Sequence, residues 1–190
     1  MKSFSILLLA VIFAGLGPSS DLRGQSLEDR GAKTTTAPAA KTEDVGSVDA
    51  ILKALYDTIS GPKGSGRDWN RLRSLFHSSA RLMPVQPARE GTQMVLRPLS
   101  VEDYIKRAGP FLEREGFFET EISRAIHQFG HIVQVFSTYE TRHAKEDEKP
   151  FARGINSVQL FNDGTRWWVV SVLWEQETPD LPIPPEFQKK

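Results

Sequence analysis

The feature that most constrains the fold is a change of hydropathy period in the C-terminal half of the chain. Apolar and polar residues alternate over 118–128, 132–141, 155–161 and 167–175, and this alternation predicts strands with a buried face. Gly130-His131 and Asp163-Gly164 separate the strands in pairs, as tight hairpin turns do. The sequence predicts four antiparallel strands, with a type II′ turn at Gly130 and positive φ at both Asp163 and Gly164.

Helical patterns precede these strands. Apolar residues recur at helical spacing from Val48 to Ile59 behind Ser47, a good N-cap, and Asp68 can cap a second short helix. A short strand is expected at 80–85 and a strand or covering loop at 93–98, followed by a third helix from Ser100 to about Ala108. Helices followed by a run of strands predict an α+β fold with the helices on one face of the sheet.

Composition excludes several classes of function. The 190-residue chain carries 24 basic and 24 acidic residues, so it lacks the basic surface that nucleic-acid binding requires. It has no cysteine, which excludes disulfides, thiolate metal sites and a cysteine nucleophile. The four histidines form no H-E-x-x-H motif, and we expect no metal and no cofactor.

The N-terminus predicts export. Lys2 precedes an apolar stretch from Phe4 to Leu16, which has the length of a signal-peptide core, although a buried helix or an uncleaved anchor would also fit. We expect a signal peptide over 1–24, cleaved between residues 17 and 25, and a secreted or periplasmic protein without a stable membrane anchor. Residues 25–47 lack aromatics and predict a disordered linker, 48–178 form the domain, and 179–190 form a proline-rich tail.

The chain resembles the NTF2-like (SnoaL-like) superfamily over about residues 48–177. The resemblance rests on the amphipathic opening helix, on Asp68-Trp69 leading to Leu75-Phe76 and Ala80-Arg81-Leu82, and on the closing strands 153–160 and 164–170. It implies a cone-shaped roll, in which a curved antiparallel sheet wraps around the first helix. It implies no particular activity, since the superfamily contains isomerases, dehydratases, hydrolases and non-catalytic binding domains. His77-Ser78-Ser79 stands where many relatives carry an aspartate, so no role is transferred to that position.

The first hairpin predicts one apolar face and one polar face. A turn at Gly130-His131 places Arg124 opposite Ser137 and Ile122 opposite Tyr139 on the apolar face, so Arg124 and Tyr139 are the first candidates for a ligand pocket. Arg124 could instead lie near the sheet edge and extend its charge into solvent. The other face pairs Glu119 with Arg142 and Glu121 with Glu140, either as a solvated surface or as a coupled carboxylate pair.

The second hairpin supplies the remaining candidates. Pairing about Asp163-Gly164 sets Arg153 opposite Trp174 and Asn156 opposite Ser171, with Arg153 and Asn156 on different faces unless a bulge at Gly154 intervenes. Asn156 could contact a ligand or be an ordinary satisfied amide, and Trp174 could stack on a ligand or belong to the core. Both faces of this hairpin are apolar, which favours a homodimer formed through the sheet.

We therefore expect an exported, non-catalytic domain that binds an unknown small, partly apolar molecule between its first helix and the sheet. The candidate contacts are Arg124, Tyr139, Arg153, Asn156 and Trp174. One alternative is an isomerase, dehydratase or hydrolase that uses the same cavity, although the sequence offers it no evident base. A protein-interaction module is a further alternative.

Overall fold

A computed structural model describes residues 38–188 of the chain. The predicted signal peptide and the first part of the predicted linker lie outside the described residues. Helix α1 (Thr42–Val45) falls within the segment assigned to the linker, and its Asp44 and Val45 are buried. Arg71 holds Asp44 through a 2.7 Å contact between Nη2 and Oδ1. No helix in this part of the chain is both long and apolar enough to span a membrane.

Helices α2 (Val48–Ile59) and α3 (Trp69–Leu75) begin where the sequence predicts. The side chain of Ser47 accepts from the Ala50 amide and that of Asp68 accepts from the Arg71 amide, so each helix has an N-cap. Helix α4 (Val101–Glu115) begins with a capping box between Ser100 and Asp103.

Helix α4 continues well past the predicted end at Ala108. Gly109-Pro110 suggests a helix end, yet the helix passes through Pro110. Two contacts of the following turn explain this: Leu112 is 3% exposed within the core, and its carbonyl accepts a 2.7 Å hydrogen bond from Nη2 of Arg67. Tertiary packing therefore offsets the local cost of the proline.

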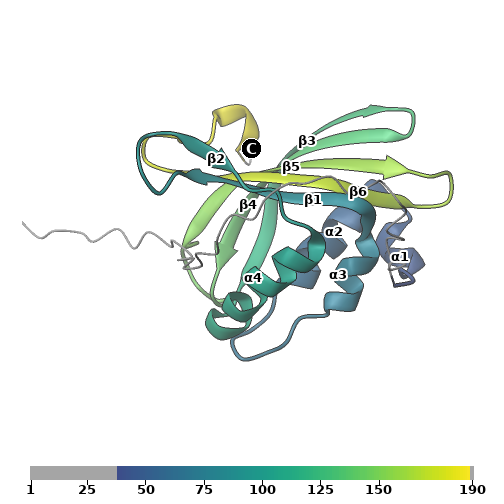
Figure 1. Ribbon diagram of the computed structural model, residues 1–190, viewed down its shortest axis with the longest axis horizontal. Coiled ribbons are helices and arrows are strands. Elements are labelled where there is room, and N and C mark those ends of the chain that lie inside the picture. Colours follow the sequence, from purple (N-terminus) through teal and green to yellow (C-terminus); the bar gives the residue numbers. More distant parts are fainter. Residues whose placement is uncertain (1–37, 189–190) are drawn as a thin grey trace, which may run out of the picture. The chain divides into compact units, whose positions relative to one another are not determined.

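The sheet has six strands in the order β2-β1-β6-β5-β4-β3. The helices lie against one face of it (Figure 1), which we call the inner face, and the opposite face is the outer face. All neighbouring strands are antiparallel except β1 and β6, which are parallel. The strands are β1 (Phe76–Pro87), β2 (Met94–Leu96), β3 (Phe118–Phe129), β4 (Ile132–Arg142), β5 (Ala152–Asn162) and β6 (Trp167–Gln176).

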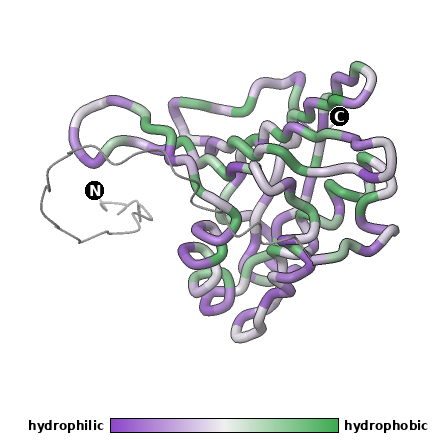
Figure 2. The backbone as a smooth tube through the Cα atoms, turned by 45° about the vertical axis from the view of Figure 1, so that its right-hand side comes forward, coloured by the Kyte–Doolittle hydropathy of each residue, from purple (hydrophilic) through white to green (hydrophobic). Residues whose placement is uncertain are grey.

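The hydrophobic core lies between the helices and the inner face. Hydropathy alternates along the strands (Figure 2), as expected where alternate side chains are buried. The fully buried core residues come from α2, α3, the start of β1 and every strand from β4 to β6; they include Ile51, Leu52, Leu72, Leu75, Phe76, Val133, Val135, Val158, Leu160 and Val169.

The predicted register of the first hairpin is confirmed near the turn and wrong at the far end. Gly130 has φ +52° and no residue other than glycine has positive φ within the described part, as a type II′ turn requires. Arg124 lies opposite Ser137, as predicted, but the register shifts between Glu121 and Ser123. Beyond this bulge at Ile122, Glu121 faces Tyr139 and Glu119 faces Thr141, so both carboxylates change faces.

The predicted register of the second hairpin is wrong. Its loop spans four residues from Asp163, whose amide donates to the Arg166 carbonyl, and only Gly164 has positive φ. A second shift falls between Gln159 and Leu160. Asn156 therefore lies opposite Trp174 instead of Ser171. The Asp163 carboxylate explains the loop, because it accepts from the amides of Thr165 and Arg166 and from Nε1 of Trp168 at 2.7–2.9 Å.

The C-terminal segment packs on the outer face. Helix η1 (Pro185–Phe187) lies on the side of the sheet away from the helices (Figure 1), and the Phe187 ring lies 5.3 Å from that of Phe136. Thr138 donates a 2.6 Å hydrogen bond to the Phe187 carbonyl, and Ile183 is buried. This segment covers part of the surface that the sequence offers to a second subunit.

Candidate functional site

The inner face carries a cluster of polar side chains within the apolar core. It consists of Tyr56 from α2, Glu119, Glu121 and Arg124 from β3, Ser137 and Tyr139 from β4, and Asn156 from β5. The bulge at Ile122 completes this cluster, because it turns both carboxylates toward the helices. The prediction that Glu119 and Glu121 face water, with Glu121 opposite Glu140, is wrong.

Glu119 is the carboxyl group with the most perturbed ionisation in the cluster. Protein groups displace most of its water, and this desolvation raises its pKa from 4.5 to about 7. Hydrogen bonds from Asn156 and Thr141 act in the opposite direction and favour the ionised form. Nδ2 of Asn156 lies 3.1 Å from Oε1 of Glu119. Such a group can accept or release a proton near neutral pH.

Tyrosine side chains from three elements surround Glu119. Burial raises the pKa of Tyr56, Tyr104 and Tyr139, and the charge of Glu119 raises each of them further. All three hydroxyls therefore stay protonated. Tyr139 fits because its cross-strand partner is Gly154: a Cβ there would lie 2.5 Å from the Tyr139 hydroxyl oxygen.

Arg124 lies on the inner face, as predicted, but its guanidinium is paired with two carboxylates of the protein. Its Nη1 lies 2.5 Å from Oδ1 of the exposed Asp49, and its Nε donates to Glu121. The Arg124 side chain is 27% exposed, and that of Glu121 is 15% exposed. The Arg124 guanidinium is therefore part of a half-buried ion pair, and it lies near enough to the edge of the sheet to remain partly hydrated.

The structure brings together four of the five predicted site residues. Tyr139, Asn156 and Trp174 share the inner face with Arg124, and the Trp174 ring meets that of Tyr104 edge-on at 6.3 Å. Arg153 lies on the outer face: its register with β4 is continuous, so no bulge at Gly154 turns it inward. It lies 3.4 Å from Glu140 and 3.2 Å from Glu177.

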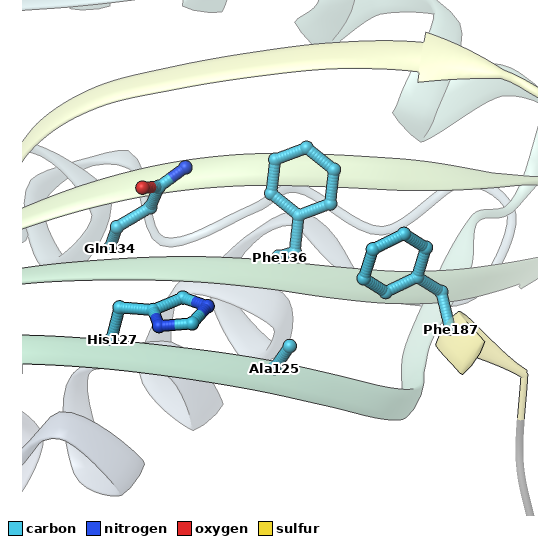
Figure 3. A pocket seen from close by; sticks show the side chains of 5 residues that line it. All are labelled: Ala125, His127, Gln134, Phe136 and Phe187. Carbon is cyan, nitrogen blue, oxygen red and sulfur yellow. The ribbon is translucent and has the colours of Figure 1, made fainter.

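A separate recess of about 220 Å³ lies on the outer face. Figure 3 shows Ala125 and His127 from β3, Gln134 and Phe136 from β4, and Phe187 reaching over them from the C-terminal segment. This recess contains no carboxyl group among its lining residues. The described residues contain no group of three or more His, Cys, Asp or Glu able to hold a metal ion.

Sequence reasoning missed Tyr56 and Tyr104, and it assigned Glu119 and Glu121 to the wrong face of the sheet. Tyr56 and Tyr104 stand at apolar positions of amphipathic helices, where a tyrosine is expected to point inward, so helical spacing could have found them. The carboxylates could not be found by alternation, because the bulge at Ile122 has no glycine or proline to reveal it.

No model of a known protein family matches the chain, and no curated protein matches it significantly. Solved structures do. A protein of unknown function with a cystatin-like fold from Nostoc punctiforme is 13% identical, with a TM-score of 0.53 over 71% of this chain and 91% of its own. LinA is 8% identical, with a TM-score of 0.51 over 74% of this chain and 92% of its own.

An NTF2-like protein of unknown function from Silicibacter pomeroyi is 16% identical, with a TM-score of 0.48 over 70% of this chain and 94% of its own. At such low identity these likenesses show the fold alone. The predicted α+β fold, with helices packed on one face of the sheet, is confirmed, although one strand pair, β1 with β6, is parallel and not antiparallel.

Proposed function

We propose that the domain binds a small, partly apolar and uncharged molecule between α2, α4 and the inner face of the sheet. The observation that carries this proposal is the hydroxyl of Tyr139. Tyr139 is only 5% exposed, and its hydroxyl makes no hydrogen bond within residues 38–188. The described buried side-chain atoms without a hydrogen-bond partner are Nε of Arg97 and Nε of Arg153, so the Tyr139 oxygen is not sealed within the protein. This hydroxyl beside Glu119 is therefore suited to a ligand oxygen.

The neighbours of Tyr139 support an apolar wall for the ligand. Tyr104 and Trp174 pack against the core, yet each keeps some accessible surface, as does Glu119. Side chains that contact the core on one side and remain accessible on the other are typical of the wall of a recess. The aromatic rings would contact the apolar part of the ligand, and Tyr139 with Glu119 would contact its polar end.

The charges of the cluster favour an uncharged polar end. Arg124 is already paired with Glu121 and Asp49, so it offers little attraction to an anion. Above about pH 7, where Glu119 is ionised, a carboxylate ligand would also place a like charge near it in a desolvated site, and such charges repel strongly. A ketone, lactone or alcohol can accept from Tyr139 without that cost.

The test compares neutral molecules with their charged analogues. Ketones, lactones and alcohols should raise the melting temperature of the protein, and carboxylates of the same carbon skeleton should not. Tyr139→Phe should keep the fold, since its hydroxyl has no protein partner, and should remove most of the ligand-induced rise. The control is Glu140→Gln, which alters a carboxylate on the outer face. Equal stabilisation of the wild type and Tyr139→Phe would exclude this site.

A second candidate, acid–base catalysis in the same site, is favoured by Glu119. A carboxyl group with a pKa near 7 can take a proton from a carbon next to a carbonyl, while Tyr139 stabilises the charge that forms on oxygen. Ketones that bind should then exchange their α-hydrogens in D₂O when the protein is present. Glu119→Gln should abolish this exchange. Binding without any exchange would leave a binding domain only.

A further inference from the structure

A continuous chain of hydrogen bonds and ion pairs links Glu119 to the protein surface. At its outer end Arg124 contacts the exposed Asp49 and donates to Glu121. Ser137 donates to the other oxygen of Glu121 and lies 2.6 Å from the hydroxyl of Tyr56. At the inner end, Nδ2 of Asn156 lies 3.1 Å from both Tyr56 Oη and Glu119 Oε1.

The number of available hydrogens fixes the direction of every bond in this chain. Glu121 accepts from Nε of Arg124 through one oxygen and from Ser137 through the other, so the single hydroxyl hydrogen of Ser137 is used in the bond to Glu121. Ser137 must then accept from Tyr56, whose own hydrogen is thereby used. Tyr56 accepts from the amide nitrogen of Asn156, and the second hydrogen of that nitrogen reaches Glu119.

We propose that Glu121 and Arg124 are positioning residues, which orient this chain so that Asn156 presents its amide nitrogen, and not its oxygen, to Glu119. The proposal rests on the proposed function only in treating Glu119 as a ligand-contacting group. Its physical content is that an ion pair at the edge of the sheet sets the hydrogen-bonding state of a carboxyl group in the interior.

The other groups facing Glu119 do not fix this orientation. Tyr56 comes from α2, Tyr104 from α4, Tyr139 and Thr141 from β4, and Asn156 from β5. Among these residues only Tyr56 and Asn156 take part in the hydrogen-bond chain that runs from Arg124 to Glu119. The hydroxyls of Tyr104 and Tyr139 make no hydrogen bond in the described part of the protein, and so remain available to a ligand.

Glu121→Gln should reverse the direction of the hydrogen bonds between residue 121 and Asn156 while keeping the shape of the side chain at position 121. Arg124 would hold the new amide by its oxygen and turn its nitrogen toward Ser137. Ser137 would then donate to Tyr56, and Tyr56 to Asn156, so the Asn156 oxygen would face Glu119. That oxygen can bind only a protonated carboxyl group.

Reversal of the hydrogen bonds and simple loss of the Glu121 charge predict opposite changes in the pKa of Glu119. A ¹³C NMR titration of Glu119 in the ligand-free protein measures this change. Reversal of the hydrogen-bond chain should raise the pKa of Glu119 by about one to two pH units, because a hydrogen bond to the charged form of Glu119 is lost. Simple removal of a nearby negative charge should lower it. The signal of Glu119 is assigned from its absence in Glu119→Gln.

Two further proteins complete the test. Glu140→Gln removes an equivalent charge on the outer face and should leave the pKa of Glu119 unchanged. Ser137→Ala breaks the chain at another point, frees the Tyr56 hydrogen to turn toward Asn156, and should also raise this pKa. It decides the question if Glu121→Gln does not fold. In the wild type, one side-chain N–H signal of Asn156 should titrate together with Glu119.

A lowered or unchanged pKa of Glu119 in Glu121→Gln, or in Ser137→Ala if the first variant does not fold, would overturn the proposal. The titration needs no ligand, so its result is independent of whether neutral molecules bind. If the pKa rises but no ligand stabilises the protein, the positioning role holds and the proposed function fails.

Discussion

The burial of Glu119 makes folding stability depend on pH in a defined direction. An unfolded chain loses the Glu119 proton near pH 4.5, whereas the folded protein keeps it to about pH 7. Between these values the folded state binds the extra proton, so this group's contribution to stability is complete below pH 4.5 and is lost as the pH rises toward 7. This shift in the pKa of Glu119 corresponds to about 3 kcal/mol in the free energy of unfolding, at about 1.4 kcal/mol per pH unit.

Glu119→Gln isolates this contribution, because glutamine has a similar shape and does not ionise. Any change in the free energy of unfolding that the glutamine amide causes independently of pH cancels when the variant and the wild type are compared at two pH values. Relative to the wild type, the variant should gain about 3 kcal/mol in free energy of unfolding between about pH 4.5 and about pH 8. Urea denaturation at both pH values measures it, with Glu140→Gln as the control. An equal difference between variant and wild type at both pH values would refute the burial of the Glu119 carboxyl.

Three further changes test other parts of the account. Gly154→Ala should cost about 1–3 kcal/mol, since its Cβ would meet the backbone carbonyl oxygen of Glu175 and the hydroxyl of Tyr139; a neutral effect in urea would refute these close contacts. Arg67→Met should cost more than about 3 kcal/mol, because the Arg67 guanidinium donates to the carbonyls of Ile59, Gly61 and Leu112; a loss below about 1 kcal/mol would contradict this role. Removing residues 179–190 should cost about 3 kcal/mol, since Ile183 and Phe187 leave the outer face; sedimentation would show a shift toward dimers if that face pairs, and unchanged stability would contradict the packing.

Much of the fold follows from local signals in the sequence. Ser47, Asp68 and Ser100 cap helices at the predicted positions, and glycine at 130 forms the predicted turn. Each of these features is decided by a few neighbouring residues. The segment after Ala108 is not, because α4 continues through Pro110 only where Leu112 meets the core and Arg67.

The candidate site depended on register, which local signals fix poorly. Arg124 and Tyr139 lie on the inner face as predicted, and the observed register adds Asn156 and Trp174 to that face. A single bulge at Ile122 decides where Glu119 and Glu121 point. A bulge moves every following side chain to the other face, so one unpredicted residue changes the chemistry of the interior. Export and a homodimer formed through the sheet stay predictions, and the C-terminal segment covers part of the surface that such a dimer would use.

The register of β3 against β4 tests the account most directly, because the inward position of both carboxylates depends on it. Cross-strand NOEs between backbone protons in the ligand-free protein identify which residues face each other. The structure predicts NOEs from Glu121 to Tyr139 and from Glu119 to Thr141. NOEs from Glu121 to Glu140 and from Glu119 to Arg142 would show an unbulged strand, with both carboxylates on the outer face and no carboxyl group of β3 beside Tyr139.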